Sequence, residues 1–333
     1  MRPVGSKTPQ TVEYEDAYMK VVRKIWKWGC LSVLALLLLL LTAATFFMLN
    51  FALSPNPGRQ PVKAHYALLF QRHPEVKPWV DSLLRTKTLR DTFVTMPTGE
   101  RHHALLARHP MSPRRVAMVI HGWRNSAIDF LHLASFYYQQ LGYSILLPDL
   151  HAHGQSEGES IGMGWQERFD VLHWMEVAAQ ALDCDTFVVH GVSMGAATAM
   201  NASGEPMPDC VKDVKFIEDC GYTSVWDEFD LRIGEEFSLP DFPLLYASSL
   251  LCKMRYGWSF GEASPLEQVK KCRHPMFFIH GDDDHFVPSW MVHPLYKAKP
   301  GTKRLWVSRD ADHNMTYFKY PEEYVRQVKE FLK

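Results

Sequence analysis

The chain has 333 residues, of which 47% are hydrophobic and 22% are charged, and its formal net charge is −1. This composition is that of a globular protein long enough to bury an extensive core. The balanced charge lacks the basic excess typical of nucleic-acid-binding proteins, so we expect no nucleic-acid partner.

The first predicted element is a transmembrane anchor at residues 30–53, a stretch without charged residues that contains the unbroken leucine run 36–41. A helix of this length exceeds the ~30 Å hydrocarbon core of a bilayer. A cleaved signal peptide is the alternative, because Thr42-Ala43-Ala44 could serve as a cleavage site. The apolar run is longer than the roughly 7–15 residues of a signal peptide, which favours an uncleaved signal anchor.

The charges on either side of this span predict its orientation. Basic residues are denser before it than after it, at Lys20, Arg23, Lys24 and Lys27 against Arg59 and Lys63. Trp26 and Trp28 are placed as interfacial anchors. By the positive-inside rule, residues 1–29 form a cytoplasmic segment of a single-pass membrane protein, and the large remainder lies outside the cytoplasm.

Residues 54–89 are predicted to be a linker and a helical stalk. Ser54-Pro55-Asn56-Pro57-Gly58 ends the preceding helix, and residues 62–86 have a helical pattern that either packs on the domain or stands free. Nothing in this stretch suggests chemistry, so a soluble fragment from about residue 60 suits an activity screen.

From residue 90 onward, short apolar runs alternate with helical patterns. Strands are predicted at 92–96, 104–108, 114–121, 144–148, 187–190, 215–219, 276–280 and 304–308, and helices at 127–141, 165–182, from about 196 and from 322. This alternation predicts an α/β fold, with a mostly parallel sheet and helices on both faces. Functional groups in such sheets gather at the carboxyl ends of the strands.

The strongest candidate follows the strand at 187–190. Gly191-Val192-Ser193-Met194-Gly195 has the G-x-S-x-G pattern of a nucleophile elbow, a strained turn between a strand and a helix. Gly191 and Gly195 leave room for this turn because they lack a Cβ atom. The helix amides after Ser193 would face negative charge that develops beside its oxygen.

Two other strand ends carry candidate groups. In His121-Gly122-Trp123, the glycine can turn the backbone and expose the amide of Trp123, although an ordinary glycine turn explains the same residues. The loop at 149–156 contains Asp149, His151 and His153, which could bind a metal ion. No further ligands complete a metal site there, so we favour a hydrogen-bond network.

Acidic residues and a histidine follow the last two strands. Asp282, Asp283 and Asp284 come after 276–280, without the alternate spacing of a calcium-binding loop. His313 comes after 304–308. The chain order Ser, Asp, His is the one associated with nucleophile elbows on this kind of sheet.

Together these residues resemble the α/β-hydrolase superfamily over about residues 90–333. The resemblance rests on His121-Gly122-Trp123, on the loop from Asp149 to Ser156, on Gly191 to Gly195, on the stretch from His280 to Pro288, and on His313. Within the superfamily the chain is similar to membrane-anchored bacterial serine hydrolases of the serine aminopeptidase and lysophospholipase-like groups. Those relatives often have Arg where this loop has His151.

The resemblance implies a catalytic triad, with Ser193 as nucleophile, Asp284 as its acidic member and His313 as general base. It implies an oxyanion hole made by the amides of Trp123 and Met194. Three glycines would shape these turns: Gly122, Gly191 and Gly195. It implies no metal or other cofactor.

Residues 220–275 are more than one crossover helix needs, and they predict a helical cap at about residues 222–262. Its many aromatic and aliphatic side chains favour an acyl or aromatic substrate group. We therefore expect a serine esterase or lipase-like enzyme that cleaves acyl or lipid-like carboxylic esters through an acyl-enzyme. The alternatives are a peptidase or aminopeptidase acting on short peptides, and a catalytically silent binding module on the same fold.

The cysteines allow one further hypothesis. Cys184 and Cys210 each precede one of two strands expected to be neighbours, so a disulfide could join them. The alternative is that the cysteines are small buried apolar residues.

Overall fold

A single eight-stranded sheet forms the centre of the structure, in the order β1-β2-β4-β3-β5-β6-β7-β8. The computed structural model describes residues 9–55, 60–111 and 114–333. The strands are β1 Leu89–Thr95, β2 Arg101–Ala107, β3 Arg115–Ile120, β4 Ser144–Pro148, β5 Thr186–Val192, β6 Asp213–Asp219, β7 Met276–Gly281 and β8 Lys303–Ser308. β2 pairs antiparallel with β1 and β4, and the other neighbours are parallel. The predicted fold class is confirmed.

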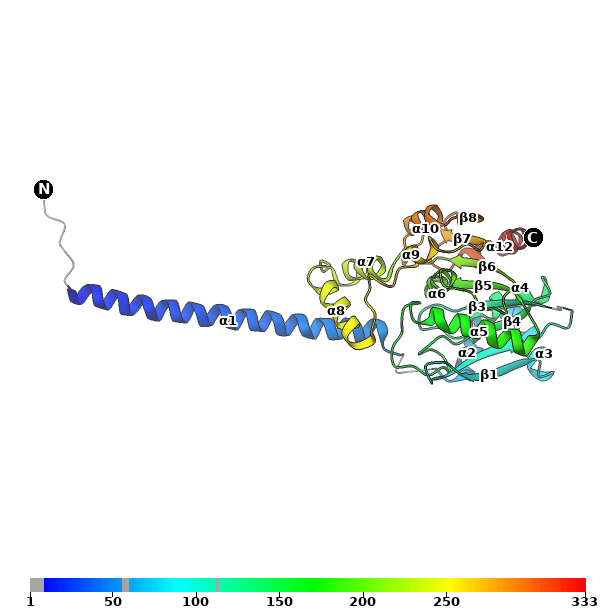
Figure 1. Ribbon diagram of the computed structural model, residues 1–333, viewed down its shortest axis with the longest axis horizontal. Helices are drawn as coiled ribbons and strands as arrows, with labels where there is room; N and C mark the ends of the chain where they lie inside the picture. Colours follow the sequence, from blue (N-terminus) through cyan, green and yellow to red (C-terminus); the bar gives the residue numbers. More distant parts are fainter. Residues whose placement is uncertain (1–8, 56–59, 112–113) are drawn as a thin grey trace.

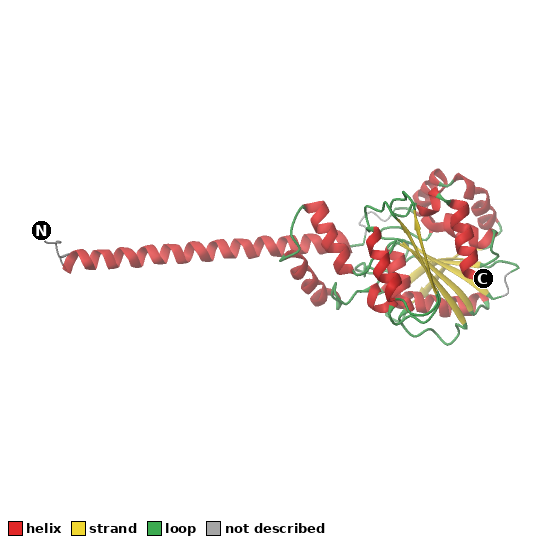
Figure 2. Ribbon diagram, turned by 90° about the horizontal axis from the view of Figure 1, so that it is seen from above, coloured by secondary structure: helices red, strands yellow, loops and turns green. Residues whose placement is uncertain are grey.

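Helices cover both faces of this sheet (Figure 2). They are α1 Pro9–Leu53, α2 Val62–Arg72, α3 Lys77–Arg85, α4 Leu131–Gln139, α5 Glu167–Leu182, α6 Met194–Ser203, α7 Val225–Phe237, α8 Leu244–Tyr256, α9 Pro265–Val269, α10 Val292–Ala298, α11 Thr316–Lys319 and α12 Pro321–Leu332, with short 3₁₀ turns at Pro74–Val76, Ile128–Phe130 and Ser289–Met291. Alternate residues of β3 point to opposite faces. Met118 belongs to the core shared with α5 and α6, and Val119 to the core shared with α4 and α12.

Helix α1 extends far from the domain as one unbroken helix (Figure 1). By length and composition it is the one helix in the described part of the chain that could cross a membrane, between Glu13 and Leu53. Its last turns behave differently, because Leu49 and Leu53 are buried in the main core of the domain. The expected span at 30–53 therefore ends in a segment that contacts protein.

The segment predicted to be a helical stalk packs on the domain instead. Leu69 of α2 and Val80 and Leu83 of α3 are buried in the same core as α4 and α12. His65 of α2 also contacts the carboxylate of Asp129, at 3.0 Å. Of the two arrangements left open for residues 62–86, the structure has the one in which the helices pack on the domain and cover one face of the sheet, and burial of their apolar sides is the physical reason.

Helices α7 and α8 lie between β6 and β7 in the chain, within the stretch expected to form a cap. They sit beside the domain end of α1, and α8 packs against α1 (Figure 1). Ser224 caps the start of α7 by accepting a hydrogen bond from the amide of Asp227 at 3.0 Å. The cap therefore occupies the junction between the long helix and the sheet.

The cysteines are free thiols, including Cys184 and Cys210, so the hypothesis of a disulfide between them is wrong for this structure. Cys184, Cys220, Cys252 and Cys272 are buried, as the alternative hypothesis expects of small apolar residues.

Candidate active site

The turn between β5 and α6 holds Ser193 in a conformation that few residues adopt. Its φ and ψ angles are 57° and −121°. A Cβ atom on Gly191 would lie 2.0 Å from the carbonyl oxygen of Gly195, and one on Gly195 would lie 2.2 Å from that of Ile120. Only glycine fits at either position, so the small residues of the motif allow the strained serine.

The structure brings the three residues expected to form a triad into one hydrogen-bonded series. His313 Nε2 lies 2.9 Å from Ser193 Oγ, and His313 Nδ1 lies 2.8 Å from Asp284 Oδ2. Ser193 follows β5, Asp284 follows β7 and His313 follows β8. Parallel strands place their carboxyl ends at the same edge of the sheet, which explains how residues distant in the chain meet here.

Asp284 is held as an acceptor by its surroundings. Its Oδ1 accepts hydrogen bonds from the amides of Phe286 and Val287, at 2.9 and 2.8 Å. Burial alone would raise the pKa of Asp284, but hydrogen bonds from His280 and His313 outweigh it and hold the pKa well below its usual range. The carboxyl group is therefore ionised at neutral pH and accepts hydrogen bonds only.

Two backbone amides lie beside Ser193 without a partner among the described residues. The amide of Met194 begins α6, where no carbonyl group of a preceding turn can accept it. The amide of Trp123 directly follows Gly122 and donates to no partner in the described backbone. A Cβ atom added to Gly122 would lie 3.4 Å from Ser193 Cβ, so the backbone at this point runs close to the serine. Trp123, Met194 and Ser193 all line one pocket.

This pocket has mainly apolar walls that come from three parts of the chain. They are Met48, Phe51 and Ala52 of α1, Phe229, Ile233 and Phe237 of α7, and Trp123, Met163, Tyr222, Phe286 and Val287 from the loops at the sheet edge. Three ionisable side chains join them: Glu228, Arg232 and Glu236. The contribution of α1 was not expected from the sequence.

The end of α1 is fixed to the loop that carries Trp123. Two hydrogen bonds do this: Arg124 Nη2 donates to the carbonyl of Phe51 (2.6 Å) and Trp123 Nε1 to that of Ala52 (3.0 Å). A third comes from the loop between β4 and α5, where the amide of Ile161 donates to the carbonyl of Leu53 (2.7 Å). These are carbonyl groups of the last helical turn, which have no partner within the helix. The domain therefore caps α1, and α1 in turn holds the loop beside Ser193.

Glu228 is an acidic group inside the apolar part of the pocket. Its side chain is 4% exposed and lies 3.6 Å from Arg232 Nε, and neither carboxyl oxygen has a hydrogen-bond partner. Burial raises the pKa of Glu228 to about 8, although the charge of Arg232 opposes this. The group is therefore largely protonated at neutral pH.

The raised pKa of Glu228 predicts how stability depends on pH. The unfolded chain releases this proton near pH 4.5 and the folded chain near pH 8. Between these two values only the folded chain keeps the proton, so the free energy of unfolding falls as the pH rises from about 4.5 and is lowest above about 8. The side chain of Glu228→Gln is neutral at every pH. The free energy of unfolding of this variant relative to that of the wild type should therefore increase by a few kcal/mol, or about 5–10 °C in Tm, between pH 5 and pH 9.

Scanning calorimetry of the full-length protein in detergent checks this expectation. Glu236→Gln is the matched control, because it removes an exposed carboxylate from the same helix. Parallel curves of Tm against pH for wild type and Glu228→Gln would contradict the assignment of a neutral, buried Glu228.

The loop at 149–156 forms the hydrogen-bond network that the sequence favoured there. Asp149 accepts from the amides of Ala127 and Gln155, at 2.7 and 2.9 Å, and its Oδ2 lies 2.7 Å from His103 Nδ1. His153 Nδ1 lies 2.9 Å from the carbonyl oxygen of His151. Asp149 is thus fully occupied by partners other than the two histidines.

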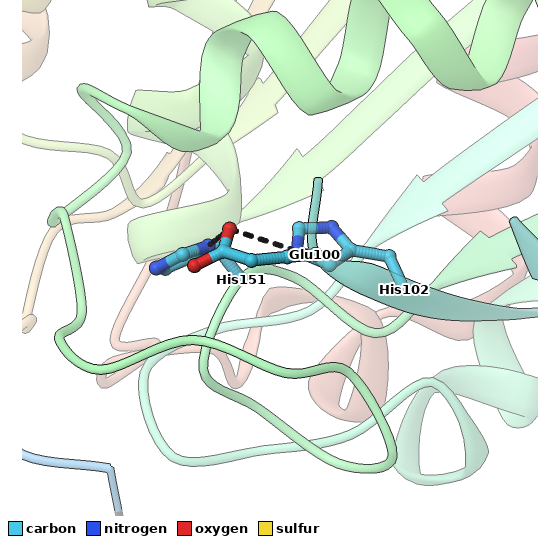
Figure 3. Close-up of side chains that lie close together, drawn as sticks. All are labelled: Glu100, His102 and His151. Carbon is cyan, nitrogen blue, oxygen red and sulfur yellow. Dashed lines mark ion pairs between the residues drawn. The ribbon is translucent and has the colours of Figure 1, made fainter. Parts of the chain in front are cut away.

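A different group of side chains near this loop could hold a metal ion. Glu100, His102 and His151 bring one ligand atom each within 4.8 Å of the others, with Glu100 Oε2 3.1 Å from His151 Nδ1 and 3.8 Å from His102 Nε2 (Figure 3). Burial lowers the pKa of His102 to about 4, so its imidazole is neutral. Glu100 lies in the turn between β1 and β2, His102 on β2 and His151 in the loop after β4, and none of the three lines the Ser193 pocket.

Cys220, Asp284 and His313 also lie close enough to share a metal ion. Burial raises the pKa of the Cys220 thiol well above its usual range, so it stays protonated. A protonated thiol is a poor metal ligand, and the other two groups are already bonded to each other. The closeness of Asp284 and His313 is therefore explained by their hydrogen bond to each other, and a metal site is not needed to explain it.

Comparison with known proteins gives related sequences and folds. Residues 116–327, more than half of the chain, match the family model described as the alpha/beta hydrolase family. The uncharacterized protein YqkD of Bacillus subtilis (strain 168) is 31% identical over 208 residues, which cover 62% of this chain and 66% of that protein, just under two thirds of its length.

Solved structures share the fold. The Pyrococcus furiosus esterase Pf2001 is 24% identical, with a TM-score of 0.58, and the match covers 73% of this chain and 91% of that chain. The Pyrococcus horikoshii acylaminoacyl peptidase is 16% identical, with a TM-score of 0.55, and the match covers 76% of this chain and 42% of that chain.

Proposed function

Because this chain belongs to the alpha/beta hydrolase family, we propose that it is a serine hydrolase that cleaves carboxylic esters with an apolar acyl group. The observation that carries the proposal is the hydrogen-bonded series Ser193, His313 and Asp284 beside an apolar pocket. No cofactor enters this chemistry.

The proposed mechanism follows from which atoms can donate. Ionised Asp284 can only accept, so His313 carries its proton on Nδ1 and leaves Nε2 free to accept from the Ser193 hydroxyl. As Ser193 Oγ attacks the ester carbonyl, Nε2 takes its proton and later gives it to the leaving alcohol. A water molecule then attacks the acyl-enzyme by the same route, which returns the serine and releases the acid.

The amides of Met194 and Trp123 are proposed to form the oxyanion hole. Their lack of other partners among the described residues supports this role, as does their place on the pocket wall beside Ser193. Each such donor typically contributes about 10²–10³-fold to the rate. The hydrogen bond from the Trp123 indole to Ala52 would hold this loop in position for the reaction.

The pocket supports an ester with an apolar acyl group over a peptide. An aminopeptidase needs a fixed negative charge to bind the substrate ammonium group. Glu228, the buried carboxyl of the pocket, is largely neutral at pH 7, and the other carboxyl on the pocket wall, Glu236, is exposed to solvent. The apolar walls contributed by α1 and α7 instead suit a hydrocarbon chain.

We further propose that α1 anchors the protein in a membrane, with its basic N-terminal end in the cytoplasm and the catalytic domain outside. The length and composition of the helix and the basic residues before the apolar run support this arrangement. Burial of Leu49 and Leu53 in the domain argues for an anchor that is retained.

A substrate panel tests the proposed function. The full-length protein in detergent should hydrolyse p-nitrophenyl esters, with kcat/KM rising from acetate to medium-chain acyl groups, and aminoacyl anilides at least 100-fold more slowly. Faster hydrolysis of the anilides would identify a peptidase. Failure of the folded protein to react with a fluorophosphonate probe would identify a non-catalytic binding module.

A further inference from the structure

The cap exposes a row of apolar side chains next to α1. Phe242, Tyr246, Leu250 and Met254 are 68%, 52%, 63% and 75% exposed, and they follow one another at intervals of four residues. This spacing places Tyr246, Leu250 and Met254 on one face of α8, and Phe242 lies just before the helix begins. The opposite face of α8 is buried and includes Leu245 and Cys252. A soluble protein rarely exposes a contiguous apolar patch of this kind without a partner for it.

The position of this row relative to α1 indicates what covers it. Helix α8 packs against α1 at the junction with the domain (Figure 1). The ring of Phe237, at the end of α7, lies 6.3 Å from that of Phe47 and 6.4 Å from that of Phe51. The exposed apolar surface of α1 therefore continues onto the cap.

The length of α1 sets the level of the bilayer surface. A ~30 Å hydrocarbon core corresponds to about 20 helical residues. Counted from Gly29, just after the interfacial Trp26 and Trp28, such a span ends near Met48. Phe47 is still 58% exposed, whereas Leu49 is 1% exposed and contacts the domain. The cap and the pocket wall formed by Met48 and Phe51 thus meet the bilayer surface.

We propose that the exposed face of α8 (Tyr246, Leu250 and Met254), together with Phe242 just before it, is seated in the bilayer, and that the Ser193 pocket takes an amphiphilic ester directly from the membrane past the end of α1. This inference rests on the proposed function of Ser193. The pocket wall contains Met48, Phe51 and Ala52 of the anchor itself, so an acyl chain in the outer leaflet can pass into the pocket beside α1 without crossing water.

The polar groups of the pocket match the other half of such a substrate. Both carboxyl oxygens of Glu228 and the Nε atom of Arg232 are buried and have no hydrogen-bond partner. Unpaired buried polar groups are costly, and a bound substrate with hydroxyl groups on its alcohol part would satisfy them. An apolar chain and a hydroxylated head are the two parts of a lipid-like ester.

One experiment separates membrane loading from the chemistry. The full-length protein is reconstituted in phosphatidylcholine vesicles and given 4-methylumbelliferyl oleate in the same bilayer, or 4-methylumbelliferyl acetate in solution. Leu250→Glu with Met254→Glu puts charges on the proposed membrane face without touching the pocket. Met111→Glu is the control. Met111 is 81% exposed and lies before β3, near the amino ends of the parallel strands, whereas Ser193 lies at their carboxyl ends. Active sites are counted with a fluorophosphonate probe.

The charged double variant should hydrolyse the oleate at least tenfold more slowly per active site and the acetate within twofold of the wild type, while Met111→Glu leaves both rates within twofold. Unchanged oleate hydrolysis, or an equal fall with both esters, would overturn the membrane entrance. A wild-type protein that hydrolyses neither ester and takes no label would instead overturn the proposed function.

Discussion

Ser193→Ala is expected to lower ester hydrolysis by roughly 10⁴-fold or more and to abolish labelling by a fluorophosphonate probe. Alanine keeps the Cβ atom, so the turn between β5 and α6 is preserved and only the nucleophilic oxygen is lost. The Tm of the variant should therefore stay within about 2 °C of the wild type. Steady-state kinetics with p-nitrophenyl esters, paired with calorimetry, measures both quantities. Turnover at the wild-type rate would disprove the assignment of Ser193 as nucleophile.

Asp284, the proposed acidic member of the triad, has a matched control in the preceding residue, Asp283. Asp284→Asn leaves the shape of the side chain but removes the acceptor that fixes the proton of His313 on Nδ1, and a loss of about 10³–10⁴-fold is expected. Asp283→Asn changes a carboxylate that is 58% exposed and does not contact His313, so its rate should stay within about threefold of the wild type. Equal losses in the two variants would contradict the choice of Asp284.

The sheet could be predicted closely from the sequence because its strands are short apolar runs bounded by turns. The strand at Ser144–Pro148 has the predicted ends, and the others differ by up to three residues. The rule that functional groups follow parallel strands then pointed to Ser193, to the run Asp282–Asp284 and to His313 before any distance was known, and the family resemblance chose Asp284 within that run. The strand order alone brings these residues to the carboxyl ends of the parallel strands. Their proximity could therefore be predicted without knowledge of side-chain packing.

The contribution of α1 to the pocket could not be predicted, for a physical reason. A helix that is apolar on all sides has the same sequence pattern whether lipid or protein surrounds it. Leu40 is exposed and Leu49 is buried in the domain, yet nothing in the leucine-rich run distinguishes them. The hydrogen bonds of Trp123 and Arg124 to carbonyl groups of α1 join residues some 70 positions apart, and neither has a sequence signal.

The cap shows a similar limit. The sequence shows that the cap contains several acidic residues, but it does not tell which of them are buried. Glu228 is enclosed by the packing of α7 on the pocket, whereas Glu235 and Glu236 on the same helix are exposed. Its raised pKa is therefore a consequence of tertiary structure.

The same contacts argue against using a fragment from about residue 60 for activity measurements. Residues 60–333 lack Leu49 and Leu53, each of which would stabilise the core by roughly 1.5–3 kcal/mol, and also the partners of Trp123 and Arg124. The proposed oxyanion loop loses its support and the pocket loses the wall formed by Met48, Phe51 and Ala52. This fragment should have a Tm at least 10 °C below that of the full chain and hydrolyse p-nitrophenyl octanoate at least 100-fold more slowly.

A fragment that begins at Thr42 separates two roles of α1, as the proposed membrane tether and as part of the site. It loses most of the exposed part of α1 but keeps Thr45, Leu49 and Leu53, which are buried against the domain. Its hydrolysis of p-nitrophenyl octanoate in detergent should stay within about fivefold of the full-length protein, and its Tm within about 3 °C. Equal activity and stability in the fragments from Thr42 and from Gln60 would show that α1 is only a tether. If the last turns of α1 belong to the folded domain, only the fragment from Gln60 should lose activity and stability. The fragment from Thr42 keeps the residues of α1 that contact the pocket and the loop carrying Trp123, whereas the fragment from Gln60 lacks them.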